Sequence, residues 1–521
     1  MPARGEFRVV RSRRWQGDLL VIGAALLPLA LFLARERQIA GAAGFPLDDS
    51  WIHLQFARNL AAGAGFSYNP GVPVAGSTAP LWTLLLGAGA VVSASLTMAK
   101  VVGIIATIGA ALVTRRAALA WGVRSDAALF ASIAVSWMGP MVWGALSGME
   151  VSLAALLVAA ALLTHAKDRP LASAVCAALA VLARPEALLL VPFLATSRPL
   201  TWRRITVFAV VTVAVTAPAI AFSLATAGTP YPATAAAKVE GGLVGWLGGV
   251  REPATLLWVR RPLAFFTEWI VWLATTHWLL PLALAPALIM VWRRVGRALG
   301  LVTLALVAHP LGMALLAPYR GPAFQEGRYS IHLLPLAVLT IAAAFAGRRG
   351  AATTEPAGDR DAPTLPATRG LGWTPTLAGV AWLALAIGAL VPAATRYGWA
   401  VQNINAMQVH LGHWVDKELP KNARIALNDI GAIAFFSRRE VIDLMGLVTP
   451  EIIPYRRRGE TGVMEYVSET CPEYLIIFPA WFPRLAASTE TLQPIYRVRL
   501  ERNEVAGAAE MVVYRLLRCA V

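Results

Sequence analysis

Charged residues are scarce in this sequence. Asp, Glu, Lys and Arg together make up 15% of the 521 residues, while hydrophobic residues make up 57%. A soluble domain carries about 25% charged residues, so the composition excludes an ordinary soluble fold. Many separate apolar runs are long enough to cross a bilayer, and we therefore expect a polytopic, all-α membrane protein.

Acidic residues are the scarcer of the two charge types. The chain has 46 Lys and Arg against 30 Asp and Glu, which gives a net charge of +16. The arginines form short clusters at the ends of apolar runs, as the positive-inside rule requires of a membrane protein. The sequence has none of the recognised nucleic-acid-binding motifs, so we expect membrane lipid and no nucleic acid as a partner.

Cysteines are also few, and they show no metal-ligand spacing. Cys176 lies in an apolar run, where packing is its expected role. Cys471 and Cys519 could pair if their region lies outside the cytoplasm. A nucleotide-binding glycine loop, an HExxH sequence and a G-x-S-x-G sequence are absent as well, which argues against a soluble activated nucleotide as a substrate.

The apolar runs predict about eleven spans. The first, at about 18–34, follows five arginines within the first sixteen residues, so we expect the N-terminus in the cytoplasm. The stretch 80–95 is expected to be a juxtamembrane or re-entrant helix, because a crossing there would place the Arg115–Arg116 pair outside. The other spans are expected at 98–114, 127–145, 151–165, 170–183, 186–197, 205–227, 268–292, 299–317, 331–346 and 375–395.

The character of the chain changes near residue 399. We expect a transmembrane domain over 1–398, with an extracytoplasmic loop and juxtamembrane helices at 35–97 and a polar cytoplasmic linker at 347–372. In 399–521 a helical stretch at about 401–418 precedes short apolar runs typical of strands, namely RIALND, AIAFF, VIDLMG, YLIIFP and MVVYRL. This part is expected to be a small extracytoplasmic α/β domain.

Two adjacent carboxylates stand out in the first loop. Asp48 and Asp49 directly precede an amphipathic run, so we expect them at the N-terminus of a short surface helix, with His53 one turn further on. Neighbouring carboxylates repel each other, which raises one pKa and makes that group a better base near neutral pH. The alternative is that Asp48 only caps a helix.

Other polar residues are expected on the same side of the membrane. Glu150 begins a span, and Arg184 and Glu186 flank a proline in a membrane-level turn, where a local ion pair is the alternative to a functional role. Lys238 and Arg328 lie beside membrane entry points. Cations there suit an anionic lipid headgroup, because a phosphate leaving group needs fixed positive charge, although interfacial snorkelling would also explain them.

The order of these motifs resembles a known family, the polyprenyl-phosphate-sugar-dependent glycosyltransferases of the GT-C fold, and in particular its arabinofuranosyltransferase-like branch. The features that carry the resemblance are Asp48-Asp49, Arg58-Asn59, Gly63, Gly65, Asn69-Pro70-Gly71, SGME at 147–150, ARPEA at 183–187, PYPATAAAK at 230–238, GRYSIHLLP at 327–335 and NDIGAIAFFSRREVIDLMGLVTPEI at 428–452. Two departures are Ala233, where the family usually has Asn, and Ala75, where an acidic residue is common.

The resemblance implies a plasma-membrane enzyme of cell-envelope biogenesis. It would transfer a sugar, with arabinofuranose as one candidate, from a polyprenyl phosphate to an extracytoplasmic hydroxyl of a glycan, lipid or protein, with inversion. Asp48 or Asp49 would be the general base, Glu150 a second acidic position, and Lys238 and Arg328 the groups that bind the donor phosphate. The residues expected to line the cavity are His53, Arg58, Arg184 and Glu186. Only some enzymes of this fold need a divalent metal such as Mg²⁺ or Mn²⁺, so metal use stays open.

The alternative from another class is a non-enzymatic flippase or polymer transporter. A transporter is expected to place its ionisable residues near the bilayer midplane within broken helices. Here these residues lie in loops on the outside and at the ends of spans, which favours an interfacial enzyme.

Overall fold

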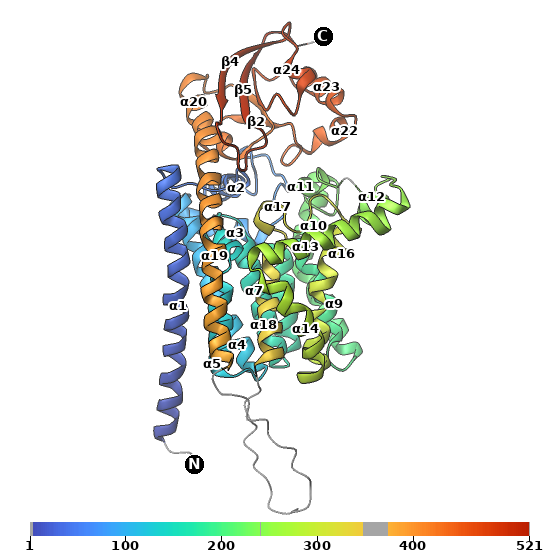
Figure 1. Ribbon diagram of the computed structural model, residues 1–521. Coiled ribbons are helices and arrows are strands. Elements are labelled where there is room, and N and C mark those ends of the chain that lie inside the picture. Colours follow the sequence, from blue (N-terminus) through green and yellow to red (C-terminus); the bar gives the residue numbers. More distant parts are fainter. Residues whose placement is uncertain (1–3, 240, 347–373, 520–521) are drawn as a thin grey trace, which may run out of the picture.

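The computed structural model describes residues 4–239, 241–346 and 374–519 (Figure 1). A bundle of helices forms the lower part of the molecule in this view, and a small α/β domain covers its upper end. Helix α1 (Arg4–Ala40) runs beside the long helix α19 (Thr374–Ile404) along one side of the bundle. The start of α1 and the C-terminal domain therefore lie at opposite ends of the bundle.

Six helices in the described residues are long and apolar enough to cross a membrane: Trp15–Ala40, Leu96–Ala120, Trp202–Ala227, Arg297–Leu316, Phe324–Phe345 and Thr376–Glu418. Two bent pairs raise this number to eight if each pair is one broken span. Four shorter apolar helices occur at Pro80–Ser93, Val151–Ala166, Pro170–Ala183 and Pro185–Thr196. The architecture is that of a multi-pass membrane protein, and eleven spans would require three of these four shorter helices to cross as well.

Two expected spans are broken: the one at 127–145 bends by 57° between α5 (Ser125–Ser136) and α6 (Gly139–Leu146), and the one at 268–292 bends more sharply. Residues 268–292 were expected to form a single helix, but α13 (Arg261–Thr276) and α14 (Leu279–Arg294) meet at an angle of 117°. His277 leaves the helical conformation between them, with φ −162° and ψ 116°. Its ring stacks on Trp382 at 3.9 Å and bonds to the carbonyl oxygen of the same residue at 3.1 Å, so this packing fixes the bend.

The other helical elements of the bundle range from single turns to a helix of 26 residues. In chain order they are α2 (Asp49–Ala61), α3 (Pro80–Ser93), α4 (Leu96–Ala120), α5 (Ser125–Ser136), α6 (Gly139–Leu146), α7 (Val151–Ala166), α8 (Pro170–Ala183), η1 (Pro185–Leu190), α9 (Val191–Thr196), α10 (Trp202–Ala227), α11 (Ala233–Ala236), α12 (Gly242–Leu247), η2 (Leu256–Arg260), α15 (Arg297–Thr303), α16 (Ala305–Leu316), α17 (Phe324–Gly327), η3 (Ile331–Leu333) and α18 (Leu334–Phe345).

Small residues allow α4 and α6 to pack closely in the bundle. A Cβ atom at Gly103 of α4 would lie 2.3 Å from the carbonyl oxygen of Ala145, so only glycine fits there. Close approach through small residues is the usual basis of helix packing in membranes. Because α7 begins after Glu150 and the antiparallel α8 ends before Arg184, these two side chains meet at one end of the helix pair.

The C-terminal domain contains a five-stranded sheet in the order β2-β1-β3-β5-β4. Strand β1 is parallel to both β2 and β3, whereas β5 is antiparallel to both β3 and β4. The strands are β1 (Arg424–Leu427), β2 (Glu440–Asp443), β3 (Tyr474–Ile477), β4 (Leu492–Arg499) and β5 (Glu510–Leu516). The helical elements are η4 (Asn405–Val409), α20 (His410–Glu418), α21 (Gly431–Ser437), η5 (Pro450–Ile452), α22 (Ile453–Arg456), α23 (Glu460–Thr470) and α24 (Pro483–Ala486).

Two expectations for this domain need correction. The run AIAFF, which was expected to be a strand, lies in helix α21, whose residues are mostly buried. A short apolar run does not distinguish a buried strand from a buried helix. Strand β4 was not anticipated, because it lies at the edge of the sheet and most of its residues are exposed. The helical stretch expected at 401–418 is present as the continuation of α19.

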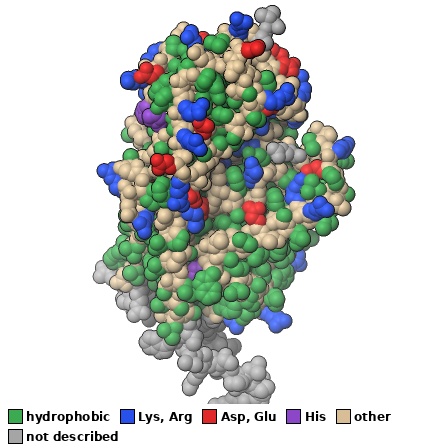
Figure 2. All heavy atoms as spheres, turned by 45° about the horizontal axis from the view of Figure 1, so that its top comes forward, with side chains coloured by type: hydrophobic (Ala, Val, Ile, Leu, Met, Phe, Trp, Pro, Cys, Tyr) green, Lys and Arg blue, Asp and Glu red, His purple; other side chains and the backbone are tan. Residues whose placement is uncertain are grey.

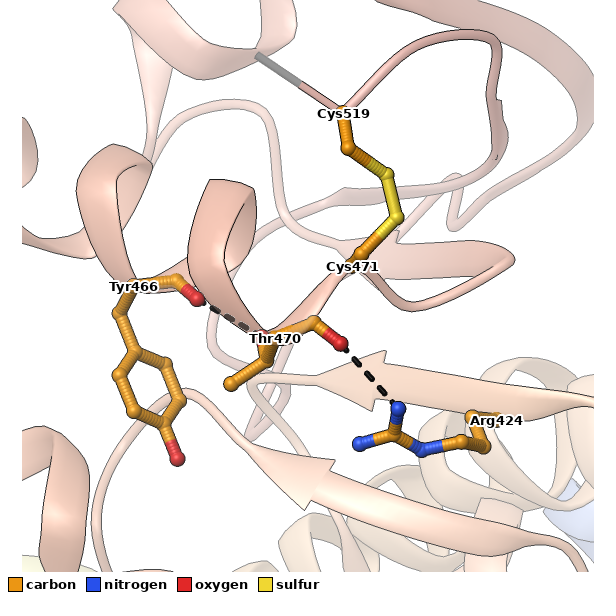
Figure 3. The surroundings of a disulfide bond; sticks show 5 residues. All are labelled: Arg424, Tyr466, Thr470, Cys471 and Cys519. Carbon is orange, nitrogen blue, oxygen red and sulfur yellow. Dashed lines mark hydrogen bonds between the residues drawn. A yellow bond between two sulfur atoms is a disulfide. The ribbon is translucent and has the colours of Figure 1, made fainter. Parts of the chain in front are cut away.

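Cys471 and Cys519 form a disulfide bond, with 5.7 Å between their Cα atoms (Figure 3). It joins the end of α23 to the segment that follows β5. Arg424 of β1 supports this corner by donating a hydrogen bond of 3.2 Å to the carbonyl oxygen of Thr470. The disulfide therefore ties the last described segment of the chain to the end of α23.

The surface changes character between the two parts of the molecule. In Figure 2, Lys, Arg, Asp and Glu side chains gather over the C-terminal domain and over its junction with the bundle. The bundle itself shows mostly apolar side chains in this view. An apolar belt below a charged cap is the arrangement expected of a protein whose bundle lies in lipid.

Candidate active site

A cavity of about 750 Å³ lies where the C-terminal domain meets the helical bundle. Its walls come from the first loop, the segment after α11, the segment 319–329, the upper part of α19 and several loops of the C-terminal domain. Asp48, Asp49, Lys238 and Arg328 all line it. The fold thus brings together four residues that were singled out in three distant parts of the sequence.

Asp49 is the first residue of α2 and faces this cavity. Its Oδ2 lies 2.8 Å from Nη1 of Arg328, and 31% of its side chain is exposed, against 6% for Arg328. Arg328 also donates a hydrogen bond of 2.6 Å to Oε1 of Gln325. Burial would raise the pKa of Asp49, but the charges of Arg328 and Lys238 hold it below its usual value. Asp49 is therefore an ionised carboxylate with an open side.

Lys238 is a cation without a matching carboxylate. Among the described residues, no carboxylate oxygen lies within 4.0 Å of its ammonium group. Its Nζ lies 5.5 Å from the centre of the Tyr319 ring, and the guanidinium carbon of Arg320 lies 5.4 Å from the same centre. Burial lowers the pKa of Lys238, and the charge of Asp49 offsets part of this. Two cations therefore face one aromatic ring on this side of the cavity.

Asp48 has a different environment, because it holds the C-terminal domain. Its side chain makes no capping bond to its own helix α2. Instead, Oδ2 accepts a hydrogen bond of 2.6 Å from the backbone N–H of Gly431, and Oδ1 accepts one of 2.7 Å from that of Ala432. Asp48 therefore caps helix α21 from the other part of the molecule. A Cβ atom at Gly431 would lie 2.0 Å from the carbonyl oxygen of Asp48.

Asp48 also forms a carboxyl pair with Asp429. Burial raises the pKa of Asp48 to about 6, and the N–H groups of Ala432 and Gly431, together with a hydrogen bond to Asp429, offset part of that rise. Burial and the charge of Asp48 raise the pKa of Asp429 well above its usual range, while Gln408 donates a hydrogen bond of 2.7 Å to it. Burial thus raises the pKa of both carboxyl groups of this pair.

Glu150, Arg184, Glu186 and His53 form a second cluster, which lies outside the lining of the cavity. Arg184 contacts Glu150 at 2.5 Å and Glu186 at 2.8 Å, and His53 Nε2 lies 3.4 Å from Glu150. Burial would raise the pKa of Glu150, but Arg184 and His53 hold it well below its usual range. The ring of Tyr329 lies 4.7 Å from the guanidinium carbon of Arg184 and 5.4 Å from that of Arg328, so it separates the cluster from the cavity.

Arg58 and the turn that follows it hold the first loop against the C-terminal domain. Arg58 donates a hydrogen bond of 2.7 Å to the carbonyl oxygen of Phe435. The side chain of Asn69 exchanges two hydrogen bonds with the backbone of Val441, of 2.8 Å and 3.0 Å. These motif residues build the interface between the two parts of the chain and do not line the cavity.

The two positions that depart from the family pattern are in contact. The backbone N–H of Ala233 donates a hydrogen bond of 2.8 Å to the carbonyl oxygen of Ala75, and both residues are buried. The next residue, Thr234, bonds to the carbonyl oxygens of Gly76 and Leu447. The substitutions by alanine therefore occur together, at a junction of three segments.

The described residues do not offer an evident metal site. No group of three or more His, Cys, Asp or Glu side chains among them is placed to hold a metal ion. Both oxygens of Asp48 accept backbone hydrogen bonds, and Asp49 faces Arg328. The residues at the cavity therefore do not fit a divalent metal between the two aspartates.

Several cavity residues were missed in the sequence. Arg320 lies in the same segment as Arg328, between α16 and α18, and a basic residue beside an apolar run is a signal that could have been used. Asn428, Asp429 and Trp481 come from loops of the C-terminal domain. Nothing in their local sequence shows that they face a cavity near residue 49.

Comparison with protein-family models gives a match in the C-terminal domain. Residues 401–514 match the model of a domain of unknown function, DUF8728. No curated protein matches the chain.

Solved structures match over nearly the whole chain. ArnT from Cupriavidus metallidurans, solved bound to undecaprenyl phosphate, is 13% identical with a TM-score of 0.55 over 96% of this chain and 99% of that one. The archaeal oligosaccharyltransferase AglB from Archaeoglobus fulgidus, in complex with an inhibitory peptide and a dolichol-phosphate, is 11% identical with a TM-score of 0.53 over 88% of this chain and 69% of that one. At these identities the likeness shows the fold, so this chain has the GT-C fold that its sequence motifs indicated.

Proposed function

We propose that the protein is an integral membrane glycosyltransferase that takes a sugar from a polyprenyl phosphate and passes it to an acceptor hydroxyl. The observation that carries the proposal is the pairing, in one cavity, of an open carboxylate at Asp49 with an unmatched cation at Lys238. The cavity lies at the end of an apolar bundle, where a lipid phosphate meets water. ArnT and AglB, which share the fold, were solved with undecaprenyl phosphate and a dolichol-phosphate respectively.

The cations around Tyr319 form the donor phosphate site. Lys238 and Arg320 face its ring. Arg328 lies nearby and is held by its contacts with Asp49 and Gln325. Fixed positive charge stabilises the phosphate as it departs, and each such donor contributes about 3 to 4 kcal/mol in comparable sites. The prenyl chain stays in the membrane beside the bundle.

Asp49 is the general base. In a single displacement, the acceptor oxygen attacks the anomeric carbon while the bond from that carbon to the phosphate oxygen breaks. The acceptor proton moves to Asp49, and polyprenyl phosphate leaves with the bonding electrons, which inverts the anomeric configuration. Asp48 is a poorer candidate, because both of its oxygens already accept hydrogen bonds from α21.

Donor binding prepares Asp49 for this role. In the free protein Asp49 is paired with Arg328, which lowers its pKa and makes it a weak base. A phosphate that competes for Arg328 and Lys238 weakens their hold on the carboxylate and adds a like charge nearby. Both effects raise the pKa of Asp49 and strengthen it as a base.

The finer assignments follow from the sequence motifs. Arabinofuranose is the first sugar to test, because the segment from Asp48 to Gly71 resembles that branch. The acceptor belongs to the cell envelope, and the cavity and residues 399–521 lie outside the cytoplasm, with residues 1–398 as the membrane domain. The disulfide between Cys471 and Cys519 supports this orientation, since disulfides persist in oxidising compartments.

The test is transfer in membranes from a panel of radiolabelled polyprenyl-phosphate sugars. Wild type is compared with Lys238→Ala and with Lys421→Ala, a control lysine whose side chain is 74% exposed on the C-terminal domain. We expect transfer from one donor, a loss of about 100-fold or more in Lys238→Ala at equal protein level, and no change in the control. Movement of the lipid-linked sugar between leaflets without transfer would contradict the proposal and identify a flippase.

A further inference from the structure

The parallel strands of the C-terminal domain end at the cavity. Asn428 and Asp429 directly follow β1, Met445 and Leu447 lie just after β2, and Trp481 comes shortly after β3, and all five line the cavity. Strands β2 and β3 lie on opposite sides of β1, so the strand order reverses direction at β1. In open α/β sheets, ligands bind outside the carboxyl ends of the strands at such a switch point. The donor site described above makes no use of this edge.

Asn428 presents an unused hydrogen-bond donor at this edge. The residue is 3% exposed, and its Oδ1 accepts a hydrogen bond of 3.1 Å from the backbone N–H of Phe478. This bond fixes the amide, because the reversed orientation would place two N–H groups against each other. Its Nδ2 is buried without a hydrogen-bond partner. A buried donor without a partner is destabilising, and a ligand oxygen would satisfy it.

Trp481 presents a fixed aromatic surface at the rim of the same cavity. Its indole N–H donates a hydrogen bond of 3.0 Å to the carbonyl oxygen of Gly507, and its ring packs 5.4 Å from that of Phe478. Even so, 43% of the residue is exposed. The other large apolar side chains exposed in the described chain after residue 418 are Ile495 and Leu517, and neither lines the cavity.

These two features fit a polyhydroxylated ring. An aromatic face packs against the C–H face of a sugar, and a fixed amide donor bonds to a hydroxyl oxygen. The remaining walls of this part of the cavity include the charged side chains of Arg456 and Glu504, which also suit hydroxyl groups. An acyl chain would leave all of these polar groups without partners.

We propose that Asn428 and Trp481 form the acceptor subsite and that the acceptor is a saccharide. One sugar ring lies against Trp481, and Nδ2 of Asn428 donates to one of its hydroxyl oxygens. The carboxyl end of β1 is held beside Asp49 through the contact of Asp429 with Asp48, so the subsite presents the reacting hydroxyl to the base. This inference rests on the proposed function and assigns acceptor recognition to the domain matched at residues 401–514.

The test measures acceptor and donor binding separately on the purified full chain in detergent. The acceptor probes are neutral hexasaccharides of arabinose, mannose, galactose and glucose, with a decapeptide of mixed sequence for comparison. The donor probe is undecaprenyl phosphate. The variants are Trp481→Ala, Trp481→Phe, which keeps an aromatic face, and Asn428→Asp, which keeps an oxygen for the Phe478 N–H but removes the free donor.

We expect at least one hexasaccharide to bind wild type and to bind about 10-fold or more weakly to Trp481→Ala and Asn428→Asp, with near-normal binding to Trp481→Phe. Trp414→Ala is the matched control, because Trp414 stacks on Tyr496 and does not line the cavity. Undecaprenyl phosphate should bind all variants equally. Binding of the peptide alone, or of no saccharide, or equal saccharide binding by all variants, would overturn the inference. If wild type does not bind undecaprenyl phosphate, that result would instead contradict the proposed function.

Discussion

The contact between Asp48 and helix α21 predicts how the two parts of the molecule stay together. Both oxygens of Asp48 accept backbone hydrogen bonds, at 2.6 Å and 2.7 Å, from residues 383 and 384 positions away in the chain. Substitution of Asp48 by Asn keeps one acceptor oxygen and turns an NH₂ group toward the other backbone N–H. One charge-assisted hydrogen bond is lost, and a buried donor is left without a partner.

The size of the effect follows from these two bonds. A hydrogen bond to a charged group contributes about 1.5 to 3 kcal/mol, so the loss of one shifts the equilibrium between docked and undocked α21 by about 10- to 100-fold. Asp48→Ala removes both bonds and should have the larger effect. Both variants also remove the hydrogen-bonded carboxyl partner of Asp429.

Hydrogen exchange of backbone amides, measured by mass spectrometry on the full chain, tests this directly. We expect peptides that cover Gly431–Ser437 to exchange about 10- to 100-fold faster in Asp48→Asn, while peptides over β3 keep their protection. Asp416→Asn is the control, because Asp416 is partly exposed and pairs with Lys421 in the same domain. Unchanged exchange at Gly431 and Ala432 would refute the view that Asp48 holds α21.

Two further predictions concern pH and the disulfide. Arg328 and Lys238 lower the pKa of Asp49 in the free protein, so the acidic limb of the kcat/KM profile should lie below the ordinary aspartate value of 3.8. Bound phosphate raises the pKa of Asp49 and should therefore move the acidic limb of the kcat profile to higher pH. Acidic limbs at the same pH in both profiles would contradict the exchange of Arg328 between carboxylate and phosphate. The disulfide closes a loop of 48 residues, so the double variant Cys471→Ser and Cys519→Ser should lower the unfolding free energy of the C-terminal domain by about 4 kcal/mol. Thermal unfolding at matched protein concentration measures the loss, with Cys176→Ser as the control, and an unchanged midpoint would show that the cross-link does not constrain the domain.

The sequence was informative wherever a polar group interrupts an apolar chain. Ionisable residues at the membrane are costly and therefore stand out, which is why Asp48, Asp49, Lys238 and Arg328 could be selected before their common cavity was known. For these four residues a local composition was enough. The prediction that 80–95 does not cross the membrane, which was made from Arg115 and Arg116 after the next helix, stays a prediction; the structure shows a short apolar helix at Pro80–Ser93.

The features that could not be predicted depend on contacts between distant segments. Asp48 was expected to matter as a base or as a cap of its own helix, but it caps α21, which the sequence assigned to a strand. The bend at His277 depends on its stacking against Trp382, more than 100 residues away. The orphan donor of Asn428 exists only because Phe478 occupies the other end of the same amide.

In the proposed reaction, Asp49 accepts the proton of the acceptor hydroxyl. The most direct measurement compares sugar transfer by wild type, Asp49→Asn and Asp126→Asn, a control aspartate paired with Arg124 away from the cavity, at equal protein level. We expect kcat to fall by about 100-fold or more in Asp49→Asn, while undecaprenyl phosphate still binds and the control transfers normally. Transfer by Asp49→Asn at the wild-type rate would contradict this role of Asp49, and the base would then have to be sought elsewhere in the cavity.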